Sequence, residues 1–129
     1  MLWILGGVFI ILHGLVHLWM ATLSLRLVEF KADMGWTGES WILSRPLPEF
    51  TVRTIAGAGF ILAALLFVIS GVGVLAQAEW SRAWLVVSAV FSGILLLLYW
   101  DGSFEMIVQK GLIGLLIDIA VLAVVLAGK

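Results

Sequence analysis

The chain contains no cysteine in its 129 residues, which excludes disulfide bridges, thiolate-held iron–sulfur clusters and thiol catalysis. It is also poor in charge. Only 12% of its residues are charged, whereas soluble domains average about a quarter. The formal net charge of −1 offers no basic surface for the phosphate backbone of nucleic acid. We therefore expect no nucleic-acid partner.

Sequence motifs of several enzyme classes are missing as well. The chain contains no GxxxxGK[ST] run for nucleotide phosphates and no GxSxG turn for a hydrolytic serine. His13 and His17 have the spacing of a zinc-protease signature, but the residues between them are Gly-Leu-Val and include no glutamate. These absences favour a function other than catalysis.

Apolar residues, in contrast, make up 64% of the chain. A soluble fold of this length can bury only part of its surface, so a lipid bilayer is the better solvent for this composition. Four apolar runs, at residues 2–25, 55–76, 83–100 and 111–128, approach the ~20 residues that cross a bilayer core. Inside lipid such runs should form helices, because a helix satisfies the hydrogen bonds of its own backbone.

We therefore predict an all-α integral membrane protein, an antiparallel four-helix transmembrane bundle that forms a single domain over residues 1–129. The helices are expected at about residues 2–25, 52–76, 80–100 and 104–128, with an interfacial loop at about 31–48. The first run has no positively charged start, so it is interpreted as a retained helix and not as a signal peptide.

The lysines and arginines predict the orientation. Five of the seven lie in the first and third connections, at Arg26, Lys31, Arg45, Arg53 and Lys110. Positively charged connections tend to stay in the cytoplasm. We therefore expect a multi-pass protein of the cell membrane with both termini outside.

Histidine and aspartate inside the apolar runs are the most informative residues. His13 and His17 are four residues apart and share one helical face. Asp118 lies near the middle of the last run, at a similar predicted depth to His13. Ionisable residues in the membrane interior are costly and usually pair with a partner. His13 is the expected partner of Asp118, with His17 as the alternative.

These residues predict a midplane site that binds a small ligand, which could be apolar, or relays protons, as in a proton-coupled transporter. Serines and a tyrosine at matching positions extend the candidate ligand or proton site, which comprises His13, His17, Asp118, Ser88, Ser92 and Tyr99.

Three alternatives stay open at this point. The His/Asp cluster could serve only to join helices, in a structural or accessory subunit of a larger respiratory or transport complex. It could hold a metal ion through His13 and His17, with Met20 as a soft third ligand. Haem held by two histidines would need a symmetric dimer, because both histidines lie on one helix. Expected partners are lipid and either further copies of the chain or other membrane subunits.

Overall fold

A computed structural model describes residues 1–27, 39–100, 102, 104 and 111–128. The described part is all-helical, as predicted, with four helices: α1 (Leu2–Ser24), α2 (Glu49–Leu75), α3 (Ser81–Leu98) and α4 (Ile113–Ala127). The first three are long and apolar enough to cross a membrane, whereas the described part of α4 has 15 residues.

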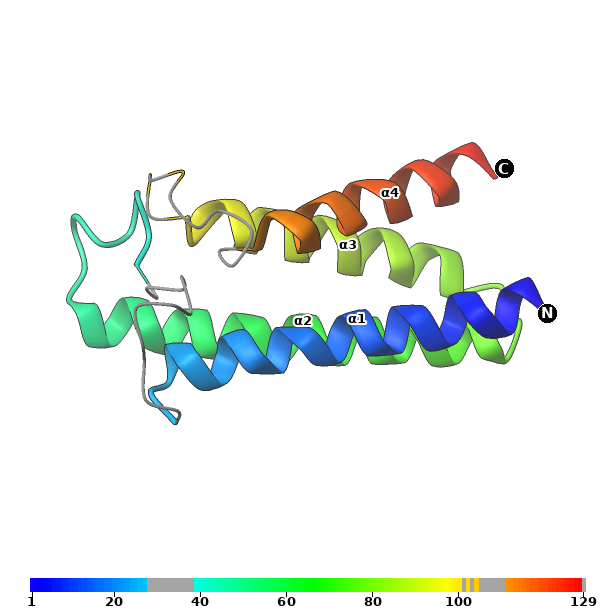
Figure 1. The fold of residues 1–129 in the computed structure, drawn as a ribbon, viewed down its shortest axis with the longest axis horizontal. Coiled ribbons are helices and arrows are strands. Elements are labelled where there is room, and N and C mark those ends of the chain that lie inside the picture. Colours follow the sequence, from blue (N-terminus) through cyan, green and yellow to red (C-terminus); the bar gives the residue numbers. More distant parts are fainter. Residues whose placement is uncertain (28–38, 101, 103, 105–110, 129) are drawn as a thin grey trace.

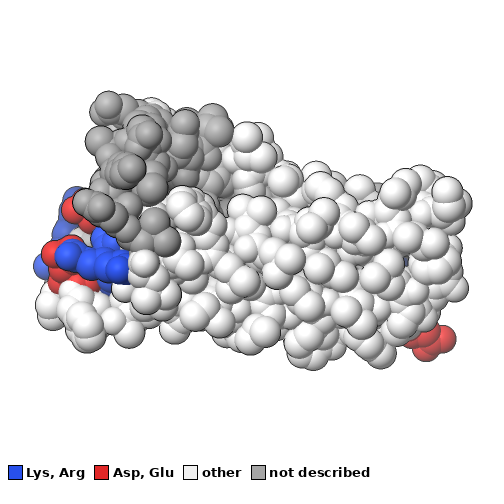
Figure 2. All heavy atoms as spheres, turned by 60° about the horizontal axis from the view of Figure 1, so that its bottom comes forward, with Lys and Arg blue, Asp and Glu red and all other residues white. Residues whose placement is uncertain are grey.

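The helices pack in two pairs (Figure 1). α1 lies along α2, and α4 lies along α3, while contacts between α2 and α3 join the pairs. Both termini lie at the same end of the molecule. Charged side chains gather at one end of the face seen in Figure 2, and most of the length of that face carries no charge.

The uncharged surface is lined with large apolar side chains. Every helix exposes some of them, for example Leu12 at 58%, Leu65 at 54%, Ile94 at 61% and Val124 at 72%. Monomeric soluble proteins rarely expose apolar patches on this scale, which suits an apolar environment or a protein partner.

Glycines let α1 approach α2 closely. A Cβ atom added at Gly14 would lie 2.6 Å from Phe67 Cβ and 3.1 Å from the Ala64 carbonyl oxygen. One at Gly71 would lie 2.8 Å from the carbonyl oxygen of Gly7. Small residues permit such backbone contact between helices, as they do in membrane bundles.

α1 and α2 each end in the same type of hydrogen-bonded turn. Arg26 and Gln77 take left-handed backbone conformations, with φ of 57° and 53°. The next amide in each case bonds five residues back, from Leu27 to the Thr22 carbonyl and from Ala78 to the Gly73 carbonyl, both at 2.9 Å. These are Schellman ends, which satisfy carbonyls that the helix itself leaves free.

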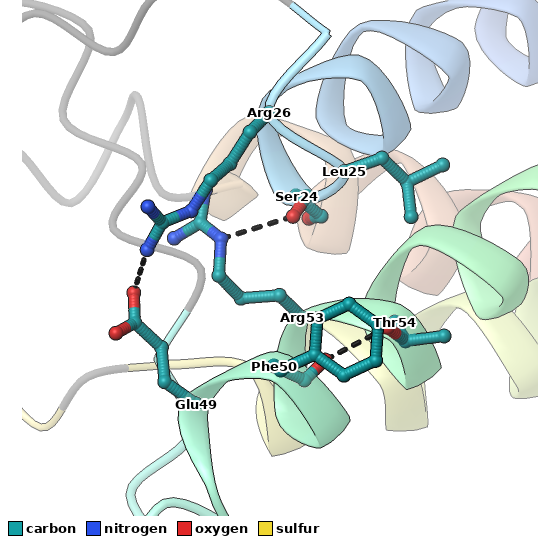
Figure 3. Close-up of a pocket in the computed structure, with 7 residues that line it drawn as sticks. All are labelled: Ser24, Leu25, Arg26, Glu49, Phe50, Arg53 and Thr54. Carbon is teal, nitrogen blue, oxygen red and sulfur yellow. Dashed lines mark hydrogen bonds and ion pairs between the residues drawn. The ribbon is translucent and has the colours of Figure 1, made fainter.

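Arg53 of α2 further secures the end of α1 (Figure 3). Its Nε donates to the Ser24 carbonyl oxygen at 3.0 Å, and its guanidinium also donates to the Leu23 carbonyl oxygen at 2.5 Å. Arg26 forms an exposed ion pair with Glu49 beside it. Together these contacts fix α1 against the start of α2.

The predicted loop at 31–48 is described only from residue 39 onward. That part lies on the end of α3, where Ser40 Oγ donates to the Leu98 carbonyl oxygen at 2.5 Å and Trp41 Nε1 to the Leu97 carbonyl oxygen at 2.8 Å. α2 then begins at Glu49, directly after Pro48 and ahead of the expected start near 52. The expected start of the last helix near 104 falls beside residues 105–110, which lie outside the described residues.

Candidate functional site

The predicted contact between His13 and Asp118 is present. His13 Nε2 lies 2.9 Å from Asp118 Oδ1, and the two side chains are buried, at 4% and 1% exposure. This bond connects α1 to α4, two helices that otherwise make few contacts with each other. It therefore joins the two helix pairs across the molecule.

His17 is held one turn further along α1. Its Nδ1 lies 3.1 Å from the His13 carbonyl oxygen, and its Nε2 lies 2.7 Å from Ser92 Oγ on α3. A carbonyl oxygen can only accept, so Nδ1 carries the proton. In the neutral ring Nε2 then accepts a hydrogen bond from the Ser92 hydroxyl. The tautomer is thus set by the fold.

Aromatic rings of α2 orient both imidazoles. Phe67 lies with its ring centroid 4.8 Å from that of His13, edge to face, and 5.4 Å from that of His17. Phe60, which precedes Phe67 on α2, also packs against His17. The close approach at Gly14 brings the histidines onto Phe67. Nothing in the apolar run around Phe67 distinguishes it from its neighbours, so the sequence did not reveal this contact.

The two carboxylate oxygens of Asp118 differ in their hydrogen bonding. Oδ1 bonds His13, whereas Oδ2 is buried and has no hydrogen-bond partner among the described residues. Leaving a buried acceptor unsatisfied costs about 1–3 kcal/mol, and more for a charged group. A hydrogen-bond donor or a cation placed at Oδ2 would remove that cost.

A cavity reaches His13 of this pair. Its volume is about 340 Å³, and it lies between α1 and α4 with Leu96 of α3 in the wall. His13, His17 and Met20 line it from α1. Gly114 lines it from α4, and a Cβ there would be 4.0 Å from His13 Cε1. The missing side chain at Gly114 thus leaves the space beside His13 open.

A second cavity lies on the other side of the pair. It has a volume of about 330 Å³ and is lined wholly by apolar residues of all four helices, among them Phe9, Val74, Leu85 and Val121. Ile117, next to Asp118, lines both cavities. The two cavities therefore meet at Ile117, the neighbour of Asp118 in the chain, while Asp118 itself lines neither of them.

Two residues of the predicted site take part in other contacts. Ser88 Oγ lies 2.9 Å from Ser70 Oγ and donates to the Trp84 carbonyl oxygen. The Tyr99 hydroxyl donates to the Val52 carbonyl oxygen at 2.8 Å, and burial raises the Tyr99 pKa to about 12. Both side chains join α3 to α2. Of the predicted α3 residues, only Ser92 contacts a histidine among the described hydrogen bonds.

The arrangement does not form a continuous proton wire in the described residues. The two imidazoles meet edge to face with centroids 5.1 Å apart. The bond between these two residues runs from the His17 ring to the His13 backbone carbonyl, not to the His13 ring. A proton therefore has no direct hydrogen-bonded route from one ring to the other. The site is better suited to hold a ligand than to conduct through fixed bonds.

His13, His17 and Asp118 could also hold a metal ion. Each offers one ligand atom, and these three atoms lie within 4.8 Å of one another in a fully buried cluster.

No model of a known protein family matches the chain, and no curated protein or solved structure matches it.

Proposed function

We propose that the chain is a four-pass membrane protein that binds a small ligand at Asp118, between α1 and α4. One observation carries the proposal. The Oδ2 oxygen of Asp118 is buried without a partner among the described residues, and His13, which bonds Oδ1, lines a cavity together with His17. The ligand is a small cation or a molecule with a hydrogen-bond donor.

Membrane insertion is part of this proposal. Three helices have the length and composition of membrane spans, and α4 continues the pattern with an apolar surface. In an antiparallel bundle with both termini outside, the site lies near the bilayer midplane. The cavity between α1 and α4 then faces lipid at its rim, so a ligand can reach Asp118 from within the membrane.

The second cavity supports a transport function for the same site. A bound ligand could leave toward the termini through the apolar space beyond the pair, once the His13–Asp118 bond opens. Because the backbones of α1 and α4 come close at few points, breaking that bond would let these two helices move apart locally, while the contacts between α2 and α3 still hold the two pairs together. Transporters commonly place their sites at such midplane contacts between helical units.

The alternative of an accessory subunit finds no support in the residues that would favour it. An accessory subunit would favour small residues on an outward contact surface, and Gly71 and Gly73 of α2 are such small residues. Gly71 packs on Gly7 and Ile11, and Gly73 packs on Trp80 within the same chain. These glycines are therefore used in the internal packing.

A carbodiimide experiment tests the proposal. Dicyclohexylcarbodiimide is an apolar reagent that adds to protonated carboxyl groups, and mass spectrometry locates the product. We expect labelling of Asp118 in the purified chain in detergent and none at this position in Asp118→Asn. In Gly114→Leu the added side chain extends into the cavity, so labelling of Asp118 should slow about tenfold or more.

The matched control is Ala123→Leu, which introduces the same leucine side chain at an exposed position of α4. This variant should label at the wild-type rate. Absence of Asp118 labelling in the wild type, or equal rates in wild type and Gly114→Leu, would show that the cavity does not lead to the carboxylate.

A further inference from the structure

The geometry points to the cuprous ion, Cu⁺, as the ligand of the site formed by His13, His17 and Asp118. This inference rests on the binding function proposed above and names the chemical class of its ligand. It is carried by three features of the described residues: the donor set, its net charge and the placement of a thioether.

The donor set is nearly assembled for a small metal ion. The three ligand atoms lie within 4.8 Å of one another. Metal–nitrogen and metal–oxygen bonds of about 2.0–2.2 Å place neighbouring ligand atoms of a tetrahedral shell about 3.3 Å apart. His13 Nε2 and Asp118 Oδ1, at 2.9 Å, need only a small separation to admit an ion between them.

His17 already has the hydrogen bond that a metal ligand needs. Metal-binding histidines almost always donate their other ring N–H to a carbonyl or carboxylate, which fixes the tautomer and the ring orientation. Nδ1 of His17 donates to the His13 carbonyl oxygen and leaves the Nε2 lone pair available. The Ser92 hydroxyl that now bonds Nε2 is a neutral group that an ion can displace.

Charge distinguishes a monovalent ion from a divalent one. The cluster contains a single carboxylate, and its residues are all buried. With neutral histidines, Cu⁺ gives a site with no net charge, whereas Zn²⁺ leaves one uncompensated positive charge. Burying an uncompensated charge among apolar residues is costly. The site therefore favours the monovalent ion.

Met20 supplies the soft ligand that Cu⁺ prefers. It lies one turn beyond His17 on α1 and lines the same cavity as both histidines. Its terminal methyl would be 3.2 Å from a Cβ atom at Gly111, so the side chain reaches across to the start of the α4 region. Thioether and imidazole ligands together select copper over harder ions.

The test is a competition for Cu⁺ between the purified chain and the coloured chelator bicinchoninate, with ascorbate present to keep copper reduced. We expect the wild type to withdraw one equivalent of Cu⁺. Asp118→Asn and Met20→Leu should each lower the affinity about tenfold or more. Glu79→Gln removes a carboxylate from an exposed turn and should leave the affinity unchanged. Zn²⁺ should bind more weakly than Cu⁺.

Two variants keep the test decisive if Asp118→Asn fails to fold. Met20→Leu removes the thioether but leaves an apolar side chain of similar size in the cavity wall. The inference is overturned if the wild type withdraws no Cu⁺, if both variants bind as the wild type does, or if Zn²⁺ binds more tightly. Carbodiimide labelling separates this failure from that of the proposed function. Cavity-dependent labelling of Asp118 without Cu⁺ binding refutes the metal alone, and loss of both refutes the site.

Discussion

Replacing His13 and Asp118 together tests whether their bond exists for stability or for binding. The two single variants are His13→Leu and Asp118→Leu, and the third protein carries both substitutions. A bond that only joins helices contributes to stability, so the double variant should be less stable than the wild type. A binding site predicts the opposite result, a double variant at least as stable as the wild type. The polar groups of such a site are only partly satisfied before the ligand binds, so replacing both removes a cost.

The structure sets the magnitudes. In His13→Leu the carboxylate of Asp118 loses its Oδ1 partner while Oδ2 already has none among the described residues. Removing one partner of a buried pair costs about 3–5 kcal/mol. Replacing both by apolar residues of similar volume is often neutral or stabilising by about 1–4 kcal/mol. We therefore expect His13→Leu to lower the free energy of unfolding by about 3 kcal/mol and the double variant to regain the wild-type value or exceed it.

Reversible denaturation in mixed detergent micelles, followed by helical circular dichroism, measures the free energy of unfolding of all four proteins. Hydrogen bonds between membrane helices average about 0.6 kcal/mol. A double variant less stable than the wild type by that amount or more would refute the reasoning. It would show that the pair stabilises the bundle in its own right.

Three further predictions concern the scaffold. Gly14→Ala places a Cβ atom 2.6 Å from Phe67 Cβ, so it should lower the free energy of unfolding by about 1–3 kcal/mol; an unchanged value would argue against the close α1–α2 contact. Gln77→Gly should raise that free energy by about 1 kcal/mol, because glycine relieves the left-handed conformation at the end of α2, and denaturation would detect it. Tyr99 is the sole tyrosine, and its pKa is raised from 10 to about 12, so tyrosinate absorbance should develop only near pH 12. The unfolded chain loses that proton first, so the associated stability is complete below pH 10 and is lost between pH 10 and about 12; a spectroscopic midpoint near 10 would mean that Tyr99 is solvated.

The helices of this protein could be predicted because their signal is local. Runs of about twenty apolar residues cannot form a soluble surface, and a helix is the structure that satisfies their backbone in lipid. The pairing of His13 with Asp118 was predictable for a related reason. Few polar groups occur in these runs, and a buried carboxylate has few partners to choose from.

Tertiary structure decided which polar residues meet. Ser88 and Ser92 differ by one helical turn, yet Ser88 bonds Ser70 and only Ser92 bonds His17. The rotation of α3 against its neighbours sets this difference, and that rotation depends on side-chain packing spread over several helices. Tyr99 was predicted to belong to the site, and the packing of α3 on α2 places its hydroxyl on the Val52 carbonyl.

The sequence alone determined that this chain is helical and apolar, and that His13, His17 and Asp118 are its unusual residues. It did so because composition and helical period depend only on residues close together in the chain. The cavity beside Gly114, the role of Phe67 and the unpartnered Oδ2 of Asp118 depend on how four helices pack. Empty space and unmet hydrogen bonds are properties of that packing, so only the tertiary structure could reveal them.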